Sequence, residues 1–309
     1  RRFPVGEFYP FNSGRKPARV TFRGRKFACA KPSLEALKKA DIAFFVSTDE
    51  VAEEFAPRLA AAGTWCIDDS SRFRLAPGVP LVIPEVNAGE LKASKKLIAG
   101  PNCTLTGAAV ALAEIHRRFG ITELRMATYQ AVSGAGKAAM CRLEEEMKAH
   151  FKGSRLKPGP GQFPRPIAFN LFPQVGGFDA EGNSGEENKV EAELKKIWSD
   201  KKIRISCTSV RVPVLRGHSL AVWFTTRKPC TEAALKKELL RTPGLKFSAK
   251  PENYPTPLEN AQRTEIVYAG RLRRAHTSRN EFQLWVVSDN LYKGAALNSV
   301  QIAEAIAGR

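Results

Sequence analysis

The sequence lacks several features that would fix its class at once. Its 309 residues contain no apolar run of about 18 residues that could span a membrane, and nothing in them predicts secretion. Internal repeats and low-complexity segments do not occur, and no complete Gly-x-Gly-x-x-Gly dinucleotide fingerprint is found. What remains is a globular chain with 43% hydrophobic and 26% charged residues.

Paired cysteines are also lacking. Six cysteines are scattered along the chain, and none forms a Cys-x-x-Cys unit. They are Cys29, Cys66, Cys103, Cys141, Cys207 and Cys230. Zinc ribbons and thioredoxin-type motifs are therefore not expected, and the sequence predicts no metal site. Scattered thiols in a chain of this length are typical of a reducing compartment, so a cytoplasmic protein is expected.

Acidic residues are few relative to basic ones. The chain has 49 Lys and Arg residues against 31 Asp and Glu, which gives a formal net charge of +18. Such an excess is compatible with nucleic-acid binding, with a membrane surface or with an enzyme for anionic substrates. No nucleic-acid-binding motif and no alternation of aromatic and basic residues accompanies the charge. Nucleic acid and membrane are therefore not expected as partners.

The first half of the chain alternates apolar runs with amphipathic segments. Residues 18–30 predict a β-hairpin with Gly24 in its turn, and Ser33 is expected to cap a short helix. A longer helix is expected over 49–62. Strands are expected at three apolar runs, which span residues 41–47, 64–68 and 80–84. Apolar strands joined by a helix are typical of a parallel sheet that is covered on both faces.

The second half of the chain predicts a different arrangement. A helix is expected from Thr104 to Phe119, with Gly120 as its stop, and a strand over 123–132 leads into the glycine-rich segment 133–136. Further helices are expected over 137–151, 186–199, 231–241 and 292–307. Further strands are expected over 205–213, 218–226, 264–273 and 282–287. The pattern indicates a mostly antiparallel sheet with helices on one side.

Cys103 is the strongest candidate for a nucleophile. It follows a strand and the turn formed by residues 100–102, and it opens a predicted helix. The unpaired N–H groups and the positive dipole end of a helix favour a thiolate at that place, and a thiolate is a plausible covalent catalyst. The alternative is that Cys103, like most free cysteines, is a small buried apolar residue.

Several polar residues stand where chemistry is commonly found. His218 follows a tight turn at the start of an apolar strand, so it is either an acid–base group or a packed residue. Arg211 interrupts an apolar run and would bind a substrate carboxylate, unless it faces solvent from an edge strand. Arg74 lies in a loop where anion sites are common, or is a surface charge. The segment 133–136 could hold a phosphate through its N–H groups.

Five segments together resemble the aspartate-β-semialdehyde dehydrogenases, and the bacterial type looks nearest. They are residues 100–104, 128–136, 186–189, 211–219 and 287–298. The segments occur in the family's order, and the resemblance covers almost the whole chain, from about Phe3 to Ile306. Several unconnected motifs in the correct order form a much more specific signal than any one of them alone.

The resemblance implies an NADPH-dependent enzyme that interconverts β-aspartyl phosphate and aspartate semialdehyde in amino-acid biosynthesis from aspartate. It implies an α/β fold with a Rossmann-like dinucleotide-binding domain over residues 1–103 and 290–309. An α+β catalytic and dimerisation domain is expected over residues 104–289. The expected partners are a small-molecule substrate, phosphate, NADP(H) and a second copy of the chain, as a homodimer or tetramer.

The resemblance also implies roles for individual residues. Cys103 would form a thioacyl enzyme, Gln130 would orient the intermediate, and His218 would be the general acid and base. The substrate would be bound by Arg211 at its α-carboxylate, Glu187 at its α-amino group, Arg74 and Lys189 at its phosphate, and also Asn102. NADP(H) would be bound by Ser13 and Arg15 at its 2′-phosphate, and by Ser133, Gly134, Gly136 and Asn290.

The most serious departure from the family pattern lies at the start of the sequence, and three alternatives to the enzyme remain. Family members open with a strand, a glycine-rich turn and a helix of roughly 30 residues, and this sequence begins after that unit, so weak NADPH binding is expected. The first alternative is N-acetyl-γ-glutamyl-phosphate reductase, which uses the same Cys and His logic, although residues 186–189 favour the aspartate enzyme. The second is a non-catalytic paralogue or fragment that keeps the dimer interface, and the third is nucleic-acid binding.

Overall fold

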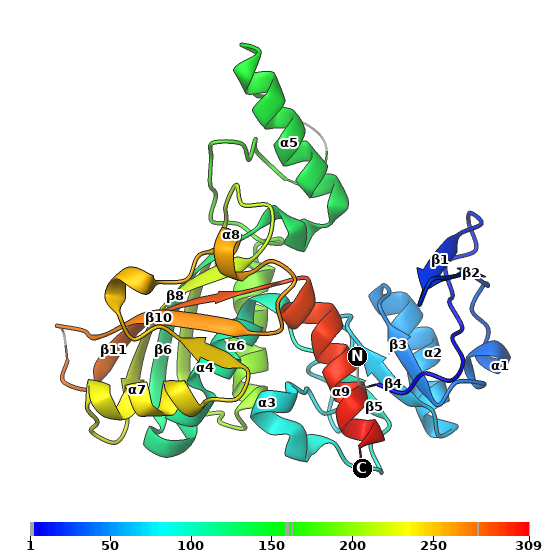
Figure 1. Cartoon of the computed structure of the whole chain (residues 1–309), viewed down its shortest axis with the longest axis horizontal. Helices are drawn as coiled ribbons and strands as arrows, with labels where there is room; N and C mark the ends of the chain where they lie inside the picture. Colours follow the sequence, from blue (N-terminus) through cyan, green and yellow to red (C-terminus); the bar gives the residue numbers. More distant parts are fainter. Residues whose placement is uncertain (1–2, 158–160, 162, 277, 309) are drawn as a thin grey trace. The chain divides into compact units, whose positions relative to one another are not determined.

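The computed structural model describes residues 3–157, 161, 163–276 and 278–308, which divide into two compact units (Figure 1). The first unit comprises Arg1–Pro84, Ala88–Gly100 and Ser299–Arg309. The second comprises Glu85–Asn87 and Pro101–Asn298. The domain boundaries expected from the sequence, at Cys103 and Asn290, stay a prediction. No helix in the described ranges is long and apolar enough to cross a membrane.

The first unit contains a small parallel sheet in the order β3-β4-β5. Strand β3 spans Ile42–Phe45, β4 Trp65–Asp68 and β5 Leu97–Ala99, and helix α2 spans Asp49–Ala61. The helix buries Ala52, Phe55 and Leu59, because apolar residues three and four apart share one face of a helix. The parallel strand–helix–strand unit predicted for this part of the chain is confirmed.

The strand predicted over 80–84 is wrong. Only an isolated bridge forms there, between Leu81 and Ala99. Pro80 and Pro84 enclose the apolar run, and neither has an N–H to donate to a strand ladder. Pro84 instead begins the short helix α3 (Pro84–Asn87), a position that suits proline because the first helical N–H groups have no partner.

The predicted hairpin and capped helix are confirmed in the same unit. Strand β1 spans Arg19–Phe22, β2 Arg25–Ala28 and helix α1 Leu34–Leu37. Arg23 and Gly24 join the antiparallel strands, and both have positive φ angles, as a two-residue type I′ turn requires. The side chain of Ser33 accepts a hydrogen bond from the N–H of Ala36 at 3.2 Å, so Ser33 is the N-cap.

The core of the first unit joins the parallel sheet to the end of the chain. Helix α9 spans Leu297–Ala307, and a 3₁₀ turn spans Ala88–Glu90. Buried apolar side chains from both parts form one cluster, which contains Ile67, Val82, Leu91, Ile98, Ile302 and Ala303. The predicted C-terminal helix over 292–307 is therefore present from Leu297, and a π-helical segment, Tyr292–Ala296, precedes it.

The second unit is built on a six-stranded sheet in the order β7-β6-β8-β11-β10-β9. The strands are β6 (Ile121–Gln130), β7 (Arg204–Arg211), β8 (His218–Thr226), β9 (Leu245–Phe247), β10 (Val267–Arg274) and β11 (Glu281–Ser288). Three of the five pairings are antiparallel, as the sequence predicts. Strands β7 and β8 are consecutive in the chain, yet β6 lies between them, parallel to β7 and antiparallel to β8.

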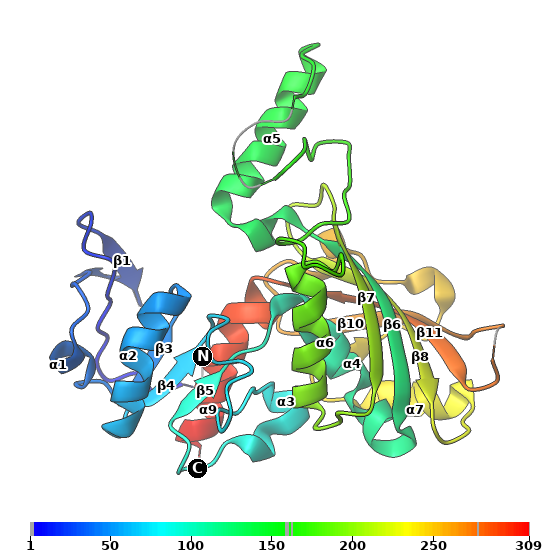
Figure 2. The same cartoon turned by 180° about the vertical axis from the view of Figure 1, so that it is seen from behind.

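Long helices pack on one face of this sheet. They are α4 (Cys103–Phe119), α6 (Gly185–Ile197) and α7 (Glu232–Arg241). Helix α5 (Lys137–Phe151) extends away from the sheet in both views (Figures 1 and 2), and short helical turns span Val132–Ala135, Pro251–Asn253 and Pro257–Asn260 (α8). On β8, Val222 and Phe224 are buried while Trp223 between them is partly exposed. Alternate residues thus separate a covered face from an open one.

Three strand ends meet at one end of the sheet. Gln130 closes β6 opposite Arg211, which closes β7, and Tyr129 pairs with Ser219 near the start of β8. The carboxyl ends of β6 and β7 and the amino end of β8 are therefore neighbours, because β8 runs antiparallel to β6. This register places Gln130, Arg211 and His218 together, although they are up to 88 positions apart in the sequence.

Candidate active site

The thiol of Cys103 and the imidazole of His218 are in contact. Cys103 is the first residue of α4, and its Sγ lies 3.6 Å from Nε2 of His218. Asn102 is the N-cap of this helix and accepts the N–H of Thr104 at 2.7 Å. Cys103 is half-buried and His218 has no exposed surface. A helix N-terminus thus presents a nucleophile to a fully desolvated imidazole.

The other cysteines are in different surroundings. Burial raises the pKa of Cys66 and of Cys207 to about 12, and it raises the pKa of Cys230 as well. A thiol with a raised pKa is a poor nucleophile near neutral pH, because the thiolate is the reactive form. Cys141 is exposed on α5. Within the described residues, Cys103 is the cysteine that contacts an imidazole.

A main-chain hydrogen bond, burial and a neighbouring charge set the protonation state of His218. Its Nδ1 atom accepts a hydrogen bond from the N–H of Ala131 at 3.1 Å. Complete burial, followed by the charge of Arg211, lowers the pKa of His218 to about 3. The imidazole is therefore neutral near physiological pH.

Arg211 is a buried cation beside this pair. It closes the edge strand β7, yet only 5% of its surface is exposed, so it does not face solvent. Its Nη1 donates to the carbonyl of Ala131 at 2.7 Å, and its guanidinium carbon lies 5.8 Å from the ring centroid of Phe163. Burial lowers the pKa of Arg211, but a guanidinium remains charged in proteins. It is suited to bind a carboxylate.

Glu186 is the centre of a buried hydrogen-bond network. Its carboxylate accepts from Nδ2 of Asn102 at 3.0 Å, Oγ1 of Thr104 at 2.6 Å and Nε2 of Gln130 at 3.0 Å. Nε2 of Gln130 also donates to Oγ1 of Thr104, and its Oε1 accepts from Thr128 at 3.0 Å. Gln130 is thereby fixed among α4, α6 and β6, with both donors and its acceptor satisfied.

Glu187 has a different position from its neighbour. Its Oε2 accepts the N–H of Ser184 at 2.6 Å, as part of a capping box, and its Oε1 accepts the N–H of Ser209 at 2.8 Å. Glu187 therefore connects the start of α6 to β7. The sequence analysis did not identify Glu186. The spacing of Ser184 and Glu187 is that of a capping box, which occupies Glu187 and leaves the side chain of Glu186 available for the site. Lys189 is exposed three positions after Glu186 on the same helix.

The glycine-rich segment lies against the reactive pair. A Cβ on Gly134 would come within 3.1 Å of Nη1 of Arg211 and 3.4 Å of Nε2 of His218. Ser133 is buried and hydrogen-bonded to Asn290, whose Oδ1 also accepts the N–H of Gly217 at 3.0 Å. Gly136 is exposed, has a φ of +89° and would have open space around a Cβ. Of the four predicted residues of this group, Gly134 lies beside Arg211 and His218, and Ser133 is joined to Asn290 by a hydrogen bond.

A π-helical segment covers the backbone of Cys103. A Cβ on Gly294, in the middle of Tyr292–Ala296, would lie 2.9 Å from Cβ of Cys103, so only glycine permits this approach. The preceding Lys293 is fully buried and donates to Oε2 of Glu85 at 2.7 Å. The sequence analysis did not identify the pair of Lys293 and Glu85. The sequence signal that could have indicated it is a lysine within a run of small and apolar residues. π-Helical turns are frequent at functional sites.

Three predicted binding residues belong to the first unit. Ser13 and Arg15 are exposed in a loop, where the N–H of Arg15 faces Oγ of Ser13 at 3.5 Å. Arg74 is half-buried, and its Nη2 donates to the carbonyl of Asp69 at 2.9 Å. The structure describes this unit by itself, so the phosphate-binding roles of these residues stay predictions.

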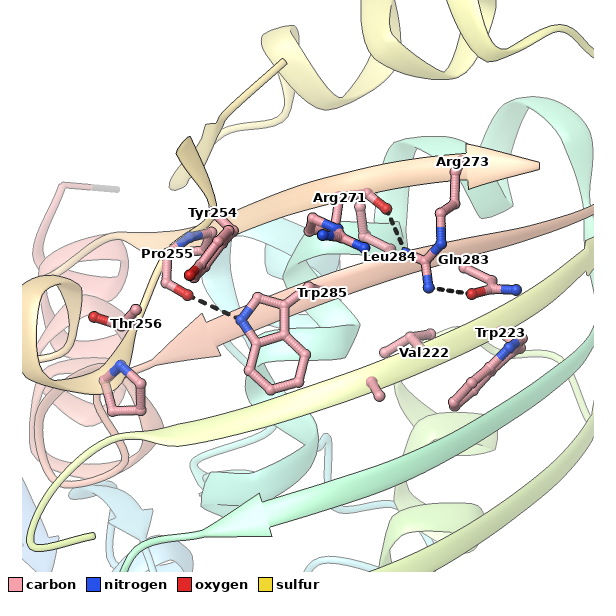
Figure 3. Close-up of a pocket in the computed structure, with 12 residues that line it drawn as sticks. Val222, Trp223, Tyr254, Pro255, Thr256, Arg271, Arg273, Gln283, Leu284 and Trp285 are labelled. Carbon is pink, nitrogen blue, oxygen red and sulfur yellow. Dashed lines mark hydrogen bonds between the residues drawn. The ribbon is translucent and has the colours of Figure 1, made fainter. Parts of the chain in front are cut away.

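The open face of the six-stranded sheet carries a hollow of its own. Its volume is about 290 Å³, and its lining includes Trp223 and Trp285 (Figure 3). Nε1 of Trp285 donates to the carbonyl of Pro255 at 2.9 Å, and Arg273 donates to Gln283. None of the lining residues belongs to the cluster around Cys103. This is an apolar surface with a few polar groups and no nucleophile.

Two family models match the chain. The model for the semialdehyde dehydrogenase dimerisation domain matches residues 112–293, more than half of the chain. The model for the semialdehyde dehydrogenase NAD binding domain matches residues 1–94. Together they confirm the predicted combination of a dinucleotide-binding domain with a dimerisation domain.

Individual relatives are similar along almost the whole chain. An aspartate-semialdehyde dehydrogenase of Aquifex aeolicus is 39% identical over 312 residues, which covers 99% of this chain and 91% of the relative. That of Bacillus subtilis is 36% identical and covers 93% of this chain and 85% of the relative.

Solved structures show the same similarity in three dimensions. Aspartate semialdehyde dehydrogenase II of Vibrio cholerae, complexed with ASA, superposes with a TM-score of 0.93 at 35% identity, covering 99% of this chain and 91% of that one. The enzyme of Candida albicans with NADP gives a TM-score of 0.72 at 22% identity over 96% of this chain and 85% of that one, a likeness of fold alone.

Proposed function

The chain belongs to the aspartate-semialdehyde dehydrogenase family, and from this premise we propose that it reduces β-aspartyl phosphate to aspartate semialdehyde with NADPH, reversibly. The observation that carries the proposal is the contact of 3.6 Å between Sγ of Cys103 and Nε2 of His218. A buried cation, Arg211, and a buried acid, Glu186, lie in the same cluster. These groups match a substrate that has an electrophilic acyl carbon, a carboxylate and an ammonium group.

Cys103 performs the covalent step of this proposal. Its thiolate attacks the acyl carbon of β-aspartyl phosphate, and the C–O bond to phosphate breaks, so that a thioacyl enzyme forms and phosphate leaves. Negative charge develops on the carbonyl oxygen during the attack and requires hydrogen-bond donors beside the sulfur. The imidazole of His218, whose Nε2 lies 3.6 Å from the sulfur, is the proposed donor.

Arg211 and Glu186 orient the substrate. A guanidinium can bind the α-carboxylate through two parallel hydrogen bonds. Glu186 replaces Glu187 as the proposed partner of the α-amino group, because both oxygens of Glu187 already accept main-chain N–H groups. The carboxylate of Glu186 has capacity for a further donor beyond its three present ones. Lys189, exposed on the same helix, is the proposed phosphate ligand in this unit.

The residues around Gly134 fit a nicotinamide ring. NADPH supplies a hydride when it is bound. Gly134 presents exposed main chain beside His218 and Arg211. A Cβ at this position would lie only 3.1 Å from Nη1 of Arg211, so a side chain would fill the space beside these two residues. Ser133 and Asn290 hold this segment in place through their mutual hydrogen bond. We assign Ser133, Gly134, Gly136 and Asn290 to the cofactor on this basis, and Ser13 and Arg15 to its 2′-phosphate.

Glu186 also favours the aspartate substrate over an N-acetylated one. N-acetyl-γ-glutamyl phosphate carries a neutral amide at its α-nitrogen, so it offers no cation to a buried carboxylate. A free α-ammonium group does, and a charged partner in a desolvated site is worth considerably more than a neutral one. The reductase of N-acetyl-γ-glutamyl phosphate is therefore the second candidate.

A homodimer formed through the open sheet face completes the proposal. The matched region includes a family dimerisation domain, and the open face of the same region exposes Trp223 and Trp285 around a hollow. Tryptophan is enriched at the centres of protein interfaces. A second copy of the chain is the proposed partner of this face.

The experiment for the proposed function runs the reaction in the phosphorylating direction. The full chain is mixed with NADP⁺, phosphate and either aspartate semialdehyde or N-acetylglutamate semialdehyde, and NADPH formation is followed by absorbance. We expect turnover with aspartate semialdehyde that depends on phosphate and is lost in Cys103→Ser. Turnover with the N-acetylated aldehyde alone would contradict the proposed substrate, and turnover with neither would contradict the activity.

A further inference from the structure

We propose that Asp289 is a positioning residue for the reacting pair, because its buried carboxylate joins the turn before His218 to the π-helical segment that lies against Cys103. This inference deepens the proposed function and rests on it for its catalytic meaning. Its effect on the reactivity of the Cys103 thiol can be measured without substrate.

Asp289 is a buried carboxylate at the end of a central strand. It has no exposed surface and directly follows β11, whose last residue, Ser288, pairs with His218. Burying a carboxylate is costly unless its oxygens accept hydrogen bonds or face a cation. Asp289 meets both conditions with donors from three segments of the second unit, at residues 216, 263 and 291–292.

The first of these segments is the turn that leads into β8. Nε of Arg216 donates to both carboxylate oxygens of Asp289 at 3.0 Å, and Nη2 of the same guanidinium lies 2.7 Å from Oδ2. The next residue, Gly217, has a φ of +90° and donates its N–H to Oδ1 of Asn290 at 3.0 Å. The side chains of two consecutive residues therefore hold this turn immediately before His218 begins β8.

The same carboxylate also holds the π-helical segment. Oδ1 of Asp289 accepts the N–H groups of Leu291 and Tyr292, each at 3.0 Å. Its main-chain carbonyl accepts the N–H of Gly294 at 2.9 Å. A carboxylate is stabilising at this place because the first N–H groups of a helical turn have no partner within the helix. A Cβ on Gly294 would lie 2.9 Å from Cβ of Cys103, so a shift of this segment would displace the cysteine.

The two groups of contacts meet in one distance, the 3.6 Å between Sγ of Cys103 and Nε2 of His218. One group fixes the start of the strand that carries the imidazole, and the other fixes the main chain packed against the nucleophile. Small displacements of reacting groups are costly to a rate, because the reaction requires a narrow range of distances and angles. In the described residues Asp289 contacts neither reacting side chain, so it acts through the segments that it joins.

The substitution Asp289→Asn removes the charge and keeps the shape. The amide retains one acceptor oxygen for Leu291 and Tyr292, whereas its NH₂ group would face the guanidinium of Arg216 and the N–H of Arg263, which are donors themselves. The contact with the turn before β8 is therefore lost, and the start of the π-helical segment keeps its partner. Circular dichroism checks that the variant is folded.

Alkylation of the full chain by iodoacetamide tests the positioning without turnover. Samples are quenched at short times and digested, and mass spectrometry gives the labelling rates of the Cys103 peptide and of the peptide of the exposed Cys141. The reactive thiolate depends on the helix N-terminus and on the imidazole contact. We expect Cys103 to be labelled about tenfold more slowly in Asp289→Asn than in the wild type, with Cys141 unchanged. An equal or higher rate for Cys103 in the folded variant would overturn the proposal.

Glu238→Gln is the matched control for lost stability. Glu238 on α7 is also a buried carboxylate, 1% exposed, and it pairs with Arg118 at 2.7 Å, near the opposite end of α4 from Cys103. We expect this variant to label Cys103 at the wild-type rate. A similar slowing in Glu238→Gln would show that lost stability, and not the position of the reacting pair, slows the thiol, and would overturn the proposal.

Two variants of Arg216 test the catalytic meaning and decide the question if Asp289→Asn does not fold. Arg216→Lys keeps a cation for the carboxylate, whereas Arg216→Met keeps only an apolar stem. We expect kcat to fall about tenfold in Arg216→Met and less than about threefold in Arg216→Lys. KM should change less than about twofold in both, because Arg211 and Glu186 are the proposed substrate ligands.

Equal losses of kcat in the two Arg216 variants, or a loss that appears only in KM, would overturn the positioning role. If the wild type shows no turnover, the proposed function fails, and the labelling rate of Cys103 in the same two variants still decides on the positioning. Slower labelling in Arg216→Met than in Arg216→Lys supports the proposal, and equal labelling overturns it.

Discussion

The two faces of the six-stranded sheet differ in the burial and the hydrogen bonding of their side chains. On the helix-covered face, Thr128 and Gln130 are buried and every amide atom of Gln130 has a partner. On the open face, Tyr129 between them is 37% exposed and its ring lies 5.5 Å from that of Trp285. The residues alternate along the same strand, so one strand serves two surfaces of opposite character.

Because the two faces differ in this way, we expect the reaction and the association of this unit to depend on separate residues. The covered face ends in a network whose members are fixed by several hydrogen bonds each, which suits groups that must hold a reacting geometry. The open face has a hollow between aromatic side chains, which suits a partner surface. A change on one face is therefore expected to leave the readout of the other unchanged.

The largest expected effect belongs to the nucleophile on the covered face. Cys103→Ser replaces the thiolate by a hydroxyl, which is far less nucleophilic near neutral pH, so kcat is expected to fall by about 10⁴-fold or more. Steady-state kinetics gives the loss, and analytical ultracentrifugation of the same variant gives the assembly state, which should not change. Retention of a tenth of the activity would break the assignment of Cys103.

The next effect is expected on the open face. Trp223→Glu places a charge in the hollow and is expected to weaken self-association by about 10²- to 10³-fold, as for loss of an interface hot spot. Sedimentation over a range of concentrations measures the change. Leu240→Glu is the control, since Leu240 is 65% exposed on α7. Equal weakening in both variants would show that the open face has no special role.

A third effect separates two neighbouring acids. Glu186→Gln removes the proposed partner of the substrate ammonium group, and kcat/KM is expected to fall by about 10²-fold. Glu187→Gln sets an amide NH₂ against a main-chain N–H and should lower the free energy of unfolding by about 1 to 2 kcal/mol without a comparable loss of kcat/KM. Kinetics and urea denaturation of both variants measure the two quantities. A loss of kcat/KM in Glu187→Gln that is absent in Glu186→Gln would return the ammonium site to Glu187.

A smaller effect is expected from the π-helical segment. The methyl group of Gly294→Ala would lie 2.9 Å from Cβ of Cys103, so the nucleophile must shift, and kcat is expected to fall about tenfold. Gly177→Ala is the matched control, because a Cβ there meets nothing within 4 Å. Identical kinetics for the two variants would mean that the close approach to Cys103 has no catalytic weight.

The last effect concerns stability against pH. Unfolded histidine titrates near pH 6.5 and His218 near pH 3, so between these values the unfolded chain binds a proton that the native one excludes. The contribution of His218 to the free energy of unfolding therefore falls as pH falls, by about 1.4 kcal/mol per pH unit. Burial raises the pKa of Asp69 to about 6, which acts in the opposite sense below that pH.

A comparison of variants isolates the histidine from Asp69. Relative to the wild type, His218→Gln is expected to gain about 2 kcal/mol between about pH 6.5 and about pH 5, because it lacks the group that opposes acid. Trp223→Phe, on the open face, should follow the wild-type curve in parallel. Urea denaturation at the two pH values measures this, and a constant difference for His218→Gln would contradict neutral burial of His218.

Local signals made much of the fold predictable. The hairpin turn at Arg23 and Gly24, the cap at Ser33 and the helix start at Cys103 are each determined by a few consecutive residues. The strand expected over 80–84 failed because its two prolines outweigh its apolar character. The position of β6 between β7 and β8 could not be predicted from the sequences of these strands, because local periodicity does not indicate which strands pair over long range.

The candidate site was predictable in part for the same reason. Cys103 and His218 stand at element ends, which sequence patterns indicate well. The choice between Glu186 and Glu187 depends on which of the two carboxylates accepts the main-chain N–H of Ser184, and only the three-dimensional contacts show this. The hydrogen bond from Ala131 to Nδ1 of His218 is donated by a main-chain N–H, so the side chain of Ala131 gives no sequence signal for it.

Capture of the covalent intermediate tests the role of Cys103 on the covered face most directly. The protein is incubated with aspartate semialdehyde and NADP⁺ without phosphate, quenched in acid, digested and examined by mass spectrometry. We expect an aspartyl thioester on the Cys103 peptide, none on the peptide of the exposed Cys141, and loss of the adduct when phosphate is added before the quench. Turnover without an adduct on Cys103, or an adduct on another cysteine, would contradict it.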